Sequence, residues 1–493
     1  MSNLIVLPMV IPILIGIILI FFRPYIKIQR LISVISIILT GGLSLYLLSK
    51  IQTNGIMTLE FGDWEAPFGI VFVADSFSML LVVTTSFVTL VCLLYAFATI
   101  GKSLEWMFFY SFVQFLIAGV NGSFLTGDLF NLFVCFEVML VASYILVMIG
   151  GTKTQLRESI KYIAINVLSS WIFLVAIAYL YGTLGTLNMA HLAVRVSEVG
   201  QTPLLTTISI LFIIVFSLKS GLLLFFWLPG SYSVPPTAVA ALFGALLTKV
   251  GIYAMFRLFT LVFHHEPSIT HTLIGVMAAV TLIVGSIGAI AYKDLRQIAA
   301  FNIVIAVGFI MVGLAVFSSV ALEGSIYYLI HDMIVKALLY LIIGTMIALT
   351  GKTRLNQMSG LIRNYPVLGW LMFIVTLSLA GIPPFSGFLG KILVGEAAVD
   401  KGAFVLLALA FISSLFVLYS LLRIFMNCFW GETILSIEDE PPLKKSLLFP
   451  SIILSIATFA LGIGAESIAV YVNDAAHTLM NPEIYIDAVL PDK

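Results

Sequence analysis

The sequence predicts an all-α, polytopic membrane protein with about 14 transmembrane helices, and three observations lead to this fold class. First, 61% of the 493 residues are hydrophobic. Second, only 10% are charged, against roughly one quarter in typical soluble domains. Third, the apolar residues gather into runs of about 20, the length that a helix needs to cross the hydrocarbon core. The 24 basic and 24 acidic residues cancel without a long like-charge run, so the charge pattern predicts no nucleic-acid partner.

The apolar runs follow one another along almost the whole chain. The predicted spans are 4–22, 31–50, 70–99, 107–125, 127–149, 159–182, 203–228, 237–260, 271–291, 298–319, 325–349, 366–398, 403–430 and 447–472. No basic residue precedes the first run and no small-residue cleavage site follows it, which predicts a retained helix and no signal peptide. Cys92, Cys135 and Cys428 each lie inside such a run without CxxC spacing, so we expect small buried hydrophobic side chains.

Two segments are too polar to span the membrane. Residues 187–199 alternate apolar side chains with His191, Arg195 and Glu198, a pattern typical of a short amphipathic helix at the membrane surface. The residues after Ala475 contain no run long enough to cross, so we expect a tail and no further domain.

The basic residues predict the orientation. They gather after the first, fifth, ninth and eleventh spans, all odd-numbered connections: Arg23, Lys27 and Arg30; Lys153, Arg157 and Lys161; Lys293 and Arg296; Lys352, Arg354 and Arg363. Cytoplasmic loops are enriched in lysine and arginine, whereas the opposite connections are acidic or neutral, as at Glu60, Asp63 and Glu65. Both termini are therefore predicted to lie outside the cytoplasm.

At least five charged residues stand mid-span, among them Glu137, Lys219, Lys249, Lys336 and Lys391. A charge at the centre of a spanning helix costs roughly 2.5–3.5 kcal/mol. A structural ion pair explains one buried lysine and one glutamate as well as a functional role does, but four lysines and one glutamate cannot all pair. Burial disfavours the charged form of a lysine. A buried lysine whose protonated and neutral forms have similar free energies can therefore carry a proton. The five residues therefore predict a proton path.

The eleventh span adds two polar neighbours. Asp332 and Lys336 have the i, i+4 spacing of a local helical ion pair, and for Asp332 this structural role and a functional one both stay open. His331 suits either a hydrogen bond to the helix or a proton relay. His264, His265 and His271 fall in a predicted loop and are expected at the surface.

Two predicted spans, the seventh and the twelfth, contain helix breakers. In the seventh these are Gly221 and then, at its cytoplasmic end, Pro229, Pro235 and Pro236; in the twelfth they are Gly381, Pro383, Pro384 and Gly387. Broken helices mark ion sites in transporters, and because five crossings separate the two breaks, two inverted five-helix repeats are expected. The predicted division is 1–106 for helices 1–3, 107–260 for the first repeat (helices 4–8), 261–430 for the second (helices 9–13), and 431–493 for helix 14 with a short tail.

Four blocks in this order match a known family. They are GDLFNLFVCFEVMLVASY, KSGLLLFFWLPGSYSVPPTAVAALFGALLTKVGIY, HDMIVKALLYLIIG and GIPPFSGFLGKILV. Through them, about spans 4 to 13 resemble the antiporter-like subunit family, which Mrp-type sodium/proton antiporters share with the membrane arm of respiratory complex I. Within the family, the residues around Glu137, the length and the short tail are similar to the D-type Mrp subunits.

The resemblance implies a role for each buried charge. Glu137 and Lys219 would form the coupling pair, Lys249 the centre of the proton path and Lys391 its end. One departure concerns the eleventh helix, where many relatives place a histidine four residues before the lysine. Here that position is Asp332, with His331 beside it.

The expected function is that of a proton-translocating subunit of a multisubunit cation (sodium)/proton antiporter in the bacterial cell membrane. Its partners would be the other subunits of a hetero-oligomeric complex, protons with sodium as the coupled cation, and the lipid bilayer. An N- or M-type subunit of a complex I-like quinone oxidoreductase is the alternative, and a structural scaffold is a third possibility. The sequence shows no phosphate loop, nucleotide fingerprint, metal cluster or hydrolase nucleophile, so we expect no cofactor and no enzyme.

Overall fold

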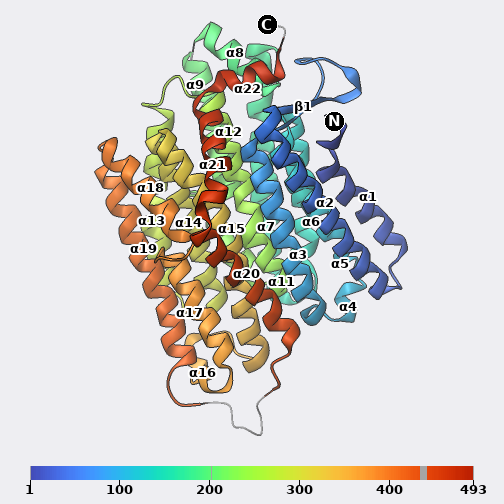
Figure 1. The fold of residues 1–493 in the computed structure, drawn as a ribbon, viewed down its shortest axis with the longest axis vertical. Helices are drawn as coiled ribbons and strands as arrows, with labels where there is room; N and C mark the ends of the chain where they lie inside the picture. Colours follow the sequence, from blue (N-terminus) through green and yellow to red (C-terminus); the bar gives the residue numbers. More distant parts are fainter. Residues whose placement is uncertain (1, 201, 434–440, 492–493) are drawn as a thin grey trace.

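The computed structural model describes residues 2–200, 202–433 and 441–491 and forms one tall bundle of helices (Figure 1). The longer helices are α1 (Leu7–Phe21), α2 (Ile26–Asn54), α3 (Ser76–Thr99), α5 (Phe109–Leu125), α6 (Leu129–Met148), α7 (Lys153–Leu184), α8 (Met189–Val199), α9 (Pro203–Ser220), α12 (Thr248–Leu261), α13 (Thr270–Ala291), α14 (Leu295–Val316), α15 (Ser319–Thr350), α17 (Pro366–Ala380), α18 (Gly387–Asp400), α19 (Phe404–Ile424), α20 (Lys445–Ile463) and α21 (Ala465–Met480).

Shorter elements link them. They are α4 (Lys102–Glu105), α10 (Leu228–Ser233), α11 (Thr237–Leu242), α16 (Leu361–Asn364), α22 (Pro482–Val489), the 3-10 turns Ser2–Leu4, Phe61–Asp63 and Leu355–Gln357, and the π-helical turns Phe243–Leu247 and Phe425–Phe429. Within the described residues, eleven helices are long and apolar enough to cross a membrane, and α1, α5 and α17 are shorter apolar helices. The number of crossings, about 14, stays a prediction from the sequence.

The centre of the bundle is formed by α3, by the helix 237–261 that joins α11 to α12, and by α14 and α15. These helices are buried over most or all of their length, whereas α2, α7, α19 and α20 expose apolar side chains on their outer faces. An apolar outside is what a bilayer requires of a spanning bundle. Charged side chains on α12 and α15 therefore lie in the most desolvated part of the molecule.

Both predicted helix breaks are present. Helix α9 ends at Gly221, whose φ of +80° is left-handed, and the chain resumes in α10. Helix α17 ends in the same way at Gly381, with φ +82°, and resumes in α18. Glycine adopts this conformation without steric cost, which explains why each helix ends where it does. The Trp227 indole bridges the first break by donating to the Leu218 carbonyl oxygen at 3.0 Å.

Two boundaries differ from the prediction. The span expected from residue 70 begins only at Ser76, because residues 71–74 form strand β2 (Val71–Ala74), paired antiparallel with β1 (Met57–Glu60), and Asp75 then caps α3. The span expected over 447–472 is divided at Gly464 between α20 and α21. The expected C-terminal tail is folded, since it forms the end of α21 and then α22, where Tyr485 is buried.

The expected surface position is wrong for His271. This side chain is 2% exposed, because its ring packs on Phe317 with ring centroids 4.3 Å apart and one ring nitrogen lies 3.0 Å from the Thr270 hydroxyl. The three cysteines are buried and free, as predicted.

The amphipathic segment is a helix, α8, which lies across one end of the bundle beside α22 (Figure 1). Met189, Leu192, Ala193 and Val196 form its buried face. Both termini lie at this end, and α4 and α16 lie at the other (Figure 1).

Candidate functional site

A charged cluster lies at the centre of the bundle, where α12 meets α15. Asp332 Oδ2 is 2.7 Å from Lys249 Nζ, and Asp332 Oδ1 is 3.2 Å from Lys336 Nζ. All three side chains are at most 1% exposed. One carboxylate thus stands between two amines that come from different helices. The i, i+4 pair predicted for Asp332 and Lys336 forms, and the structure adds Lys249 to it.

The helix carrying Lys249 is locally distorted. A π-helical turn, Phe243–Leu247, directly precedes α12, and Lys249 Nζ donates to the Gly244 carbonyl oxygen at 2.7 Å. Such turns recur at functional sites because they alter the regular backbone hydrogen bonds. A β-carbon at Gly244 would lie 2.9 Å from the Tyr340 ring, so glycine allows α15 to approach this turn closely. The turn and Asp332 together fix the lysine amine.

The predicted pair of Glu137 and Lys219 is bridged by a serine. The Ser170 hydroxyl, on α7, donates to Glu137 Oε1 on α6, and Lys219 Nζ on α9 donates to Ser170 Oγ at 3.3 Å. Lys219 Nζ also lies 5.0 Å from the centre of the Phe136 ring. The sequence did not single out Ser170, because a hydroxyl in an apolar span carries no periodic signal.

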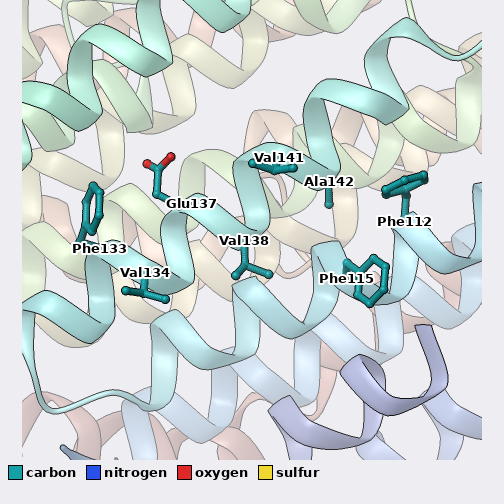
Figure 2. A pocket seen from close by; sticks show the side chains of 8 residues that line it. All are labelled: Phe112, Phe115, Phe133, Val134, Glu137, Val138, Val141 and Ala142. Carbon is teal, nitrogen blue, oxygen red and sulfur yellow. The ribbon is translucent and has the colours of Figure 1, made fainter. Parts of the chain in front are cut away.

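Glu137 lies at the outer edge of the bundle and is only partly buried. It borders a cavity of about 400 Å³, whose other lining residues are Phe112, Phe115, Phe133, Val134, Val138, Val141 and Ala142. Figure 2 shows the Glu137 carboxylate on the opposite side of the α6 ribbon from Val134 and Val138. The carboxylate therefore stands between an apolar outer cavity and the serine that leads to Lys219.

Lys391 is held at the second helix break. Its Nζ donates to the carbonyl oxygens of Leu379 and Ala380, both at 2.9 Å, at the C-terminal end of α17. These carbonyls carry the negative end of the helix dipole, which favours a cation. A β-carbon at Gly381 would lie 2.7 Å from Lys391 Cδ, so glycine also leaves room for the lysine.

His331 faces the same break. Its Nδ1 lies 2.7 Å from Ser386 Oγ, while Nε2 finds no hydrogen-bond partner among the described residues. A β-carbon at Gly387 would come within 3.0 Å of Nε2. The Tyr328 ring lies between the two groups, with its centre 5.2 Å from the His331 ring and 5.7 Å from Lys391 Nζ.

The seven predicted residues thus fall into three groups: Glu137 with Lys219; Lys249, Asp332 and Lys336; and His331 with Lys391 near the second break. Across the described residues, no direct hydrogen bond or ion pair connects one group to the next, so any transfer between them requires a side-chain movement or water.

Known proteins resemble this chain over the region that holds these groups. The family model described as "NADH:quinone oxidoreductase/Mrp antiporter, TM" matches residues 126–417, which hold all seven predicted residues. The D-type subunit of the Na(+)/H(+) antiporter of Bacillus subtilis (strain 168) is 49% identical over 493 residues, which cover the whole of both chains. The chain belongs to this antiporter family.

Solved structures agree with this assignment. A chain of the Mrp complex from Dietzia sp. DQ12-45-1b has a TM-score of 0.93 at 30% identity and matches over 99% of each chain. A chain of respiratory complex I from Thermus thermophilus has a TM-score of 0.84 at 22% identity, covering 97% of this chain and 100% of that one, and shows the fold alone. The predicted resemblance is confirmed, and this family member is a multi-pass membrane protein.

Polar cavities lie at both ends of the antiporter-family bundle. The end with the basic loops has one of about 550 Å³, bordered by Lys293, Asp294 and Arg296. Arg296 donates to the Ser233 carbonyl oxygen at 3.1 Å, beside the first break. The opposite end has one of about 600 Å³, bordered by Glu60, Glu65, His191 and Glu198. Burial and then the charge of Arg195 lower the pKa of the His191 imidazole.

A second buried ion pair, not predicted from the sequence, joins α12 to the start of α3. Arg257, inside the predicted span 237–260, lies with Nη2 2.5 Å from Asp75 Oδ2, at the start of α3. The two side chains are 3% and 1% exposed. Arg257 is visible in the sequence as a charge in an apolar run. Asp75 falls inside the predicted span 70–99, but in the structure it is the cap that directly precedes α3.

Proposed function

We propose that this chain is the proton-translocating, D-type subunit of a Mrp-type sodium/proton antiporter in the bacterial cell membrane. The observation that carries the proposal is the set of four buried lysines, the buried Asp332 and the partly buried Glu137 across the bundle, in a chain 49% identical to a D-type antiporter subunit over its full length. Its partners are the other subunits of the complex, which is supported by the match to a chain of a Mrp complex.

The first step uses Glu137, Ser170 and Lys219. Lys219 holds its proton while Glu137 is linked to it through Ser170, and it passes the proton towards Lys249 when that link opens. Two unit charges about 6 Å apart at an effective dielectric near 20 interact by about 3 kcal/mol. This energy changes the proton affinity of Lys219 by roughly a hundredfold. Opening or closing one serine bridge can therefore drive the transfer.

The second step uses the central cluster. One carboxylate, Asp332, can neutralise only one of two protonated lysines, so Lys249 and Lys336 compete for it. When a proton arrives at Lys249, Asp332 favours retention there and weakens the hold on the proton at Lys336. The cluster passes positive charge from α12 to α15 without any large movement of the backbone.

The last step uses the second break. His331 can relay the proton from the central cluster, and Lys391 receives it against the carbonyl oxygens that end α17. Freed carbonyls and water near broken helices are the usual environment for ions inside transporters. We place the exit of the path at Lys391 and the coupling to sodium in other subunits.

The proposed orientation puts the basic loops and the cavity beside Arg296 in the cytoplasm, with both termini outside. We further propose that 107–260 and 261–430 are inverted repeats, preceded by helices 1–3 in 1–106 and followed by helix 14 in 431–493. The matching breaks after Ser220 and Ala380 support this division.

The test is Glu137→Ala in everted vesicles, assayed for sodium-dependent proton flux. We expect a loss of roughly a hundredfold, the factor that corresponds to about 3 kcal/mol of lost charge interaction. The matched control is Glu396→Ala, which removes a glutamate from an apolar groove on α18 and α19 and should leave the flux unchanged. Normal flux in an assembled Glu137→Ala complex refutes the role. If Lys219→Ala or Lys391→Ala prevents assembly of the complex before it affects transport, the buried charges have a structural role.

A further inference from the structure

The end of the bundle that carries both termini is closed by segments that are far apart in the sequence. The Gly127 amide, between α5 and α6, donates to the Val71 carbonyl oxygen of β2 at 2.8 Å, and the Met189 amide of α8 donates to the Gly127 carbonyl oxygen at 2.8 Å. Helix α22 packs on α8 and β1, and α21 packs on α3 and α12. The C-terminal helices therefore form part of this closure (Figure 1).

The ion pair of Asp75 and Arg257 lies directly beneath these helices. The guanidinium carbon of Arg257 is 4.9 Å from the centre of the Tyr485 ring of α22 and 5.8 Å from that of Phe77. Asp75 also accepts a hydrogen bond from the Ser78 amide at 2.8 Å, which fixes the carboxylate at the start of α3. The neighbouring Ser76 hydroxyl donates to Asp474 of α21. The pair is thus held from α3, α12 and the C-terminal helices.

Arg257 stands on the same helical face as Lys249. Lys249, Tyr253 and Arg257 are spaced i, i+4 and i+8 on α12, so they form one stripe about 12 Å long. The Tyr253 hydroxyl donates to the Phe124 carbonyl oxygen at 2.6 Å and lies 3.4 Å from Arg257 Nη2. A line of polar groups therefore leads from the central cluster towards the end that carries the termini, and it stops at Arg257.

The chemistry of arginine decides what can happen there. A lysine at this position could continue the proposed path, because a buried lysine can lose its proton. A guanidinium keeps its proton at any accessible pH and offers donors but no acceptor. It cannot relay a proton, and its fixed positive charge repels a proton or a metal cation that approaches from Lys249.

We propose that Arg257, held by Asp75 and covered by Tyr485, is an electrostatic seal that closes the α12 end of the central cluster to protons. Protons at Lys249 must then continue through Lys336 and Lys391, because the shorter way out along α12 is blocked. The seal rests on the proposed function, since it matters only if the central cluster carries protons. In this proposal, the C-terminal helices α21 and α22 cover the ion pair of Asp75 and Arg257.

The test measures sodium-independent proton leak in proteoliposomes that hold the purified complex, with a potassium diffusion potential as the driving force. We expect Arg257→Gln to raise the leak by up to about tenfold, the effect of one charge about 12 Å away at an effective dielectric near 20. Arg257→Lys is also expected to leak, because a lysine can relay. The control is Arg195→Gln, which removes an arginine from an exposed pair on α8 at the same end.

A second pair of variants tests the route. Adding Lys249→Met to Arg257→Gln should abolish the extra leak, because the protons would pass through that lysine. Tyr485→Ala leaves the ion pair in place but opens it to water, which screens the guanidinium charge, so it should leak even if Arg257→Gln does not assemble. A wild-type leak in Tyr485→Ala and in assembled Arg257→Gln overturns the seal. A leak that persists with Lys249→Met overturns it too, since the protons then bypass the cluster.

The outcome is separate from that of the proposed function. Sodium-dependent flux in the Glu137→Ala complex tests whether the proposed path carries protons, and the leak assay contains no sodium. Intact antiport with no leak in the Arg257 variants rejects the seal alone. Wild-type antiport in Glu137→Ala rejects the path, whatever the Arg257 variants do.

Discussion

The charged groups at the edge and at the centre of the bundle are built differently. Asp332 touches Lys249 and Lys336 directly, and all three side chains are sealed from the outside. Glu137 reaches Lys219 only through Ser170 and borders an outer cavity. A direct, desolvated pair is costly to break, whereas a pair joined by a rotatable hydroxyl opens with little change in packing. The cluster around Asp332 is therefore suited to keep its ion pairs formed, whereas the pair of Glu137 and Lys219 is suited to open and close.

Asp332→Asn should produce the largest effect, because it leaves two buried amines without a carboxylate. Removing one partner of a buried ion pair typically costs about 3–5 kcal/mol. We expect a clear drop in the melting temperature of the complex, together with loss of antiport, measured by thermal unfolding in detergent and by vesicle flux.

The matched control for that variant is Glu198→Gln, which breaks the exposed pair of Arg195 and Glu198 on α8. Exposed pairs contribute about 0.2–1 kcal/mol, so its melting temperature should stay close to that of the wild type. Equal melting temperatures for both variants would show that the central cluster is solvated and that its burial does not matter.

Ser170→Ala should have the next largest effect, and on transport more than on stability. Hydrogen bonds to charged groups contribute about 1.5–3 kcal/mol, which predicts at least roughly a tenfold loss of sodium-dependent flux. Stability should change little, because the substitution removes a single hydroxyl and Glu137 is only partly buried. Ser170→Thr keeps the hydroxyl and should retain most of the flux.

The control for the serine bridge is its neighbour, Ser169. Its hydroxyl is buried and donates to the Val215 carbonyl oxygen at 3.3 Å, away from the charged pair. Ser169→Ala should therefore keep its flux within about twofold of the wild type. Equal losses in the two alanine variants would mean that packing of α7 against α9, and not the bridge, controls transport.

The sequence predicts the buried charges themselves better than the contacts between them. Charges in apolar runs and glycines or prolines in spans are strong signals, so the sequence located Lys249, Lys391 and both breaks. Contacts between helices carry no local signal. Spacing paired Asp332 with Lys336 one turn away, but its contact with Lys249, 83 residues earlier, needed the folded bundle. Ser170 is one hydroxyl among many in the spans and could not be distinguished.

The ends of the spans were predicted less well for a related reason. Residues 71–74 are as apolar as a spanning helix, and only pairing with β1 and the cap at Asp75 make them a strand. The C-terminal residues are too polar to cross alone, but they fold because Tyr485 and Asp474 find partners at the end of the bundle. Contacts with distant parts of the chain therefore determine the structure of both segments.

Ser386→Ala should have the smallest effect and extends the comparison to the second break. It removes the hydroxyl that lies 2.7 Å from His331 Nδ1 and orients the ring. A neutral hydrogen bond contributes about 1 kcal/mol, so we expect roughly a fivefold fall in flux with little loss of stability. The control is Ser378→Ala, since the buried Ser378 hydroxyl has no hydrogen-bond partner among the described residues. If both variants transport like the wild type, His331 does not take part in the relay, and the central cluster must pass protons to Lys391 through water.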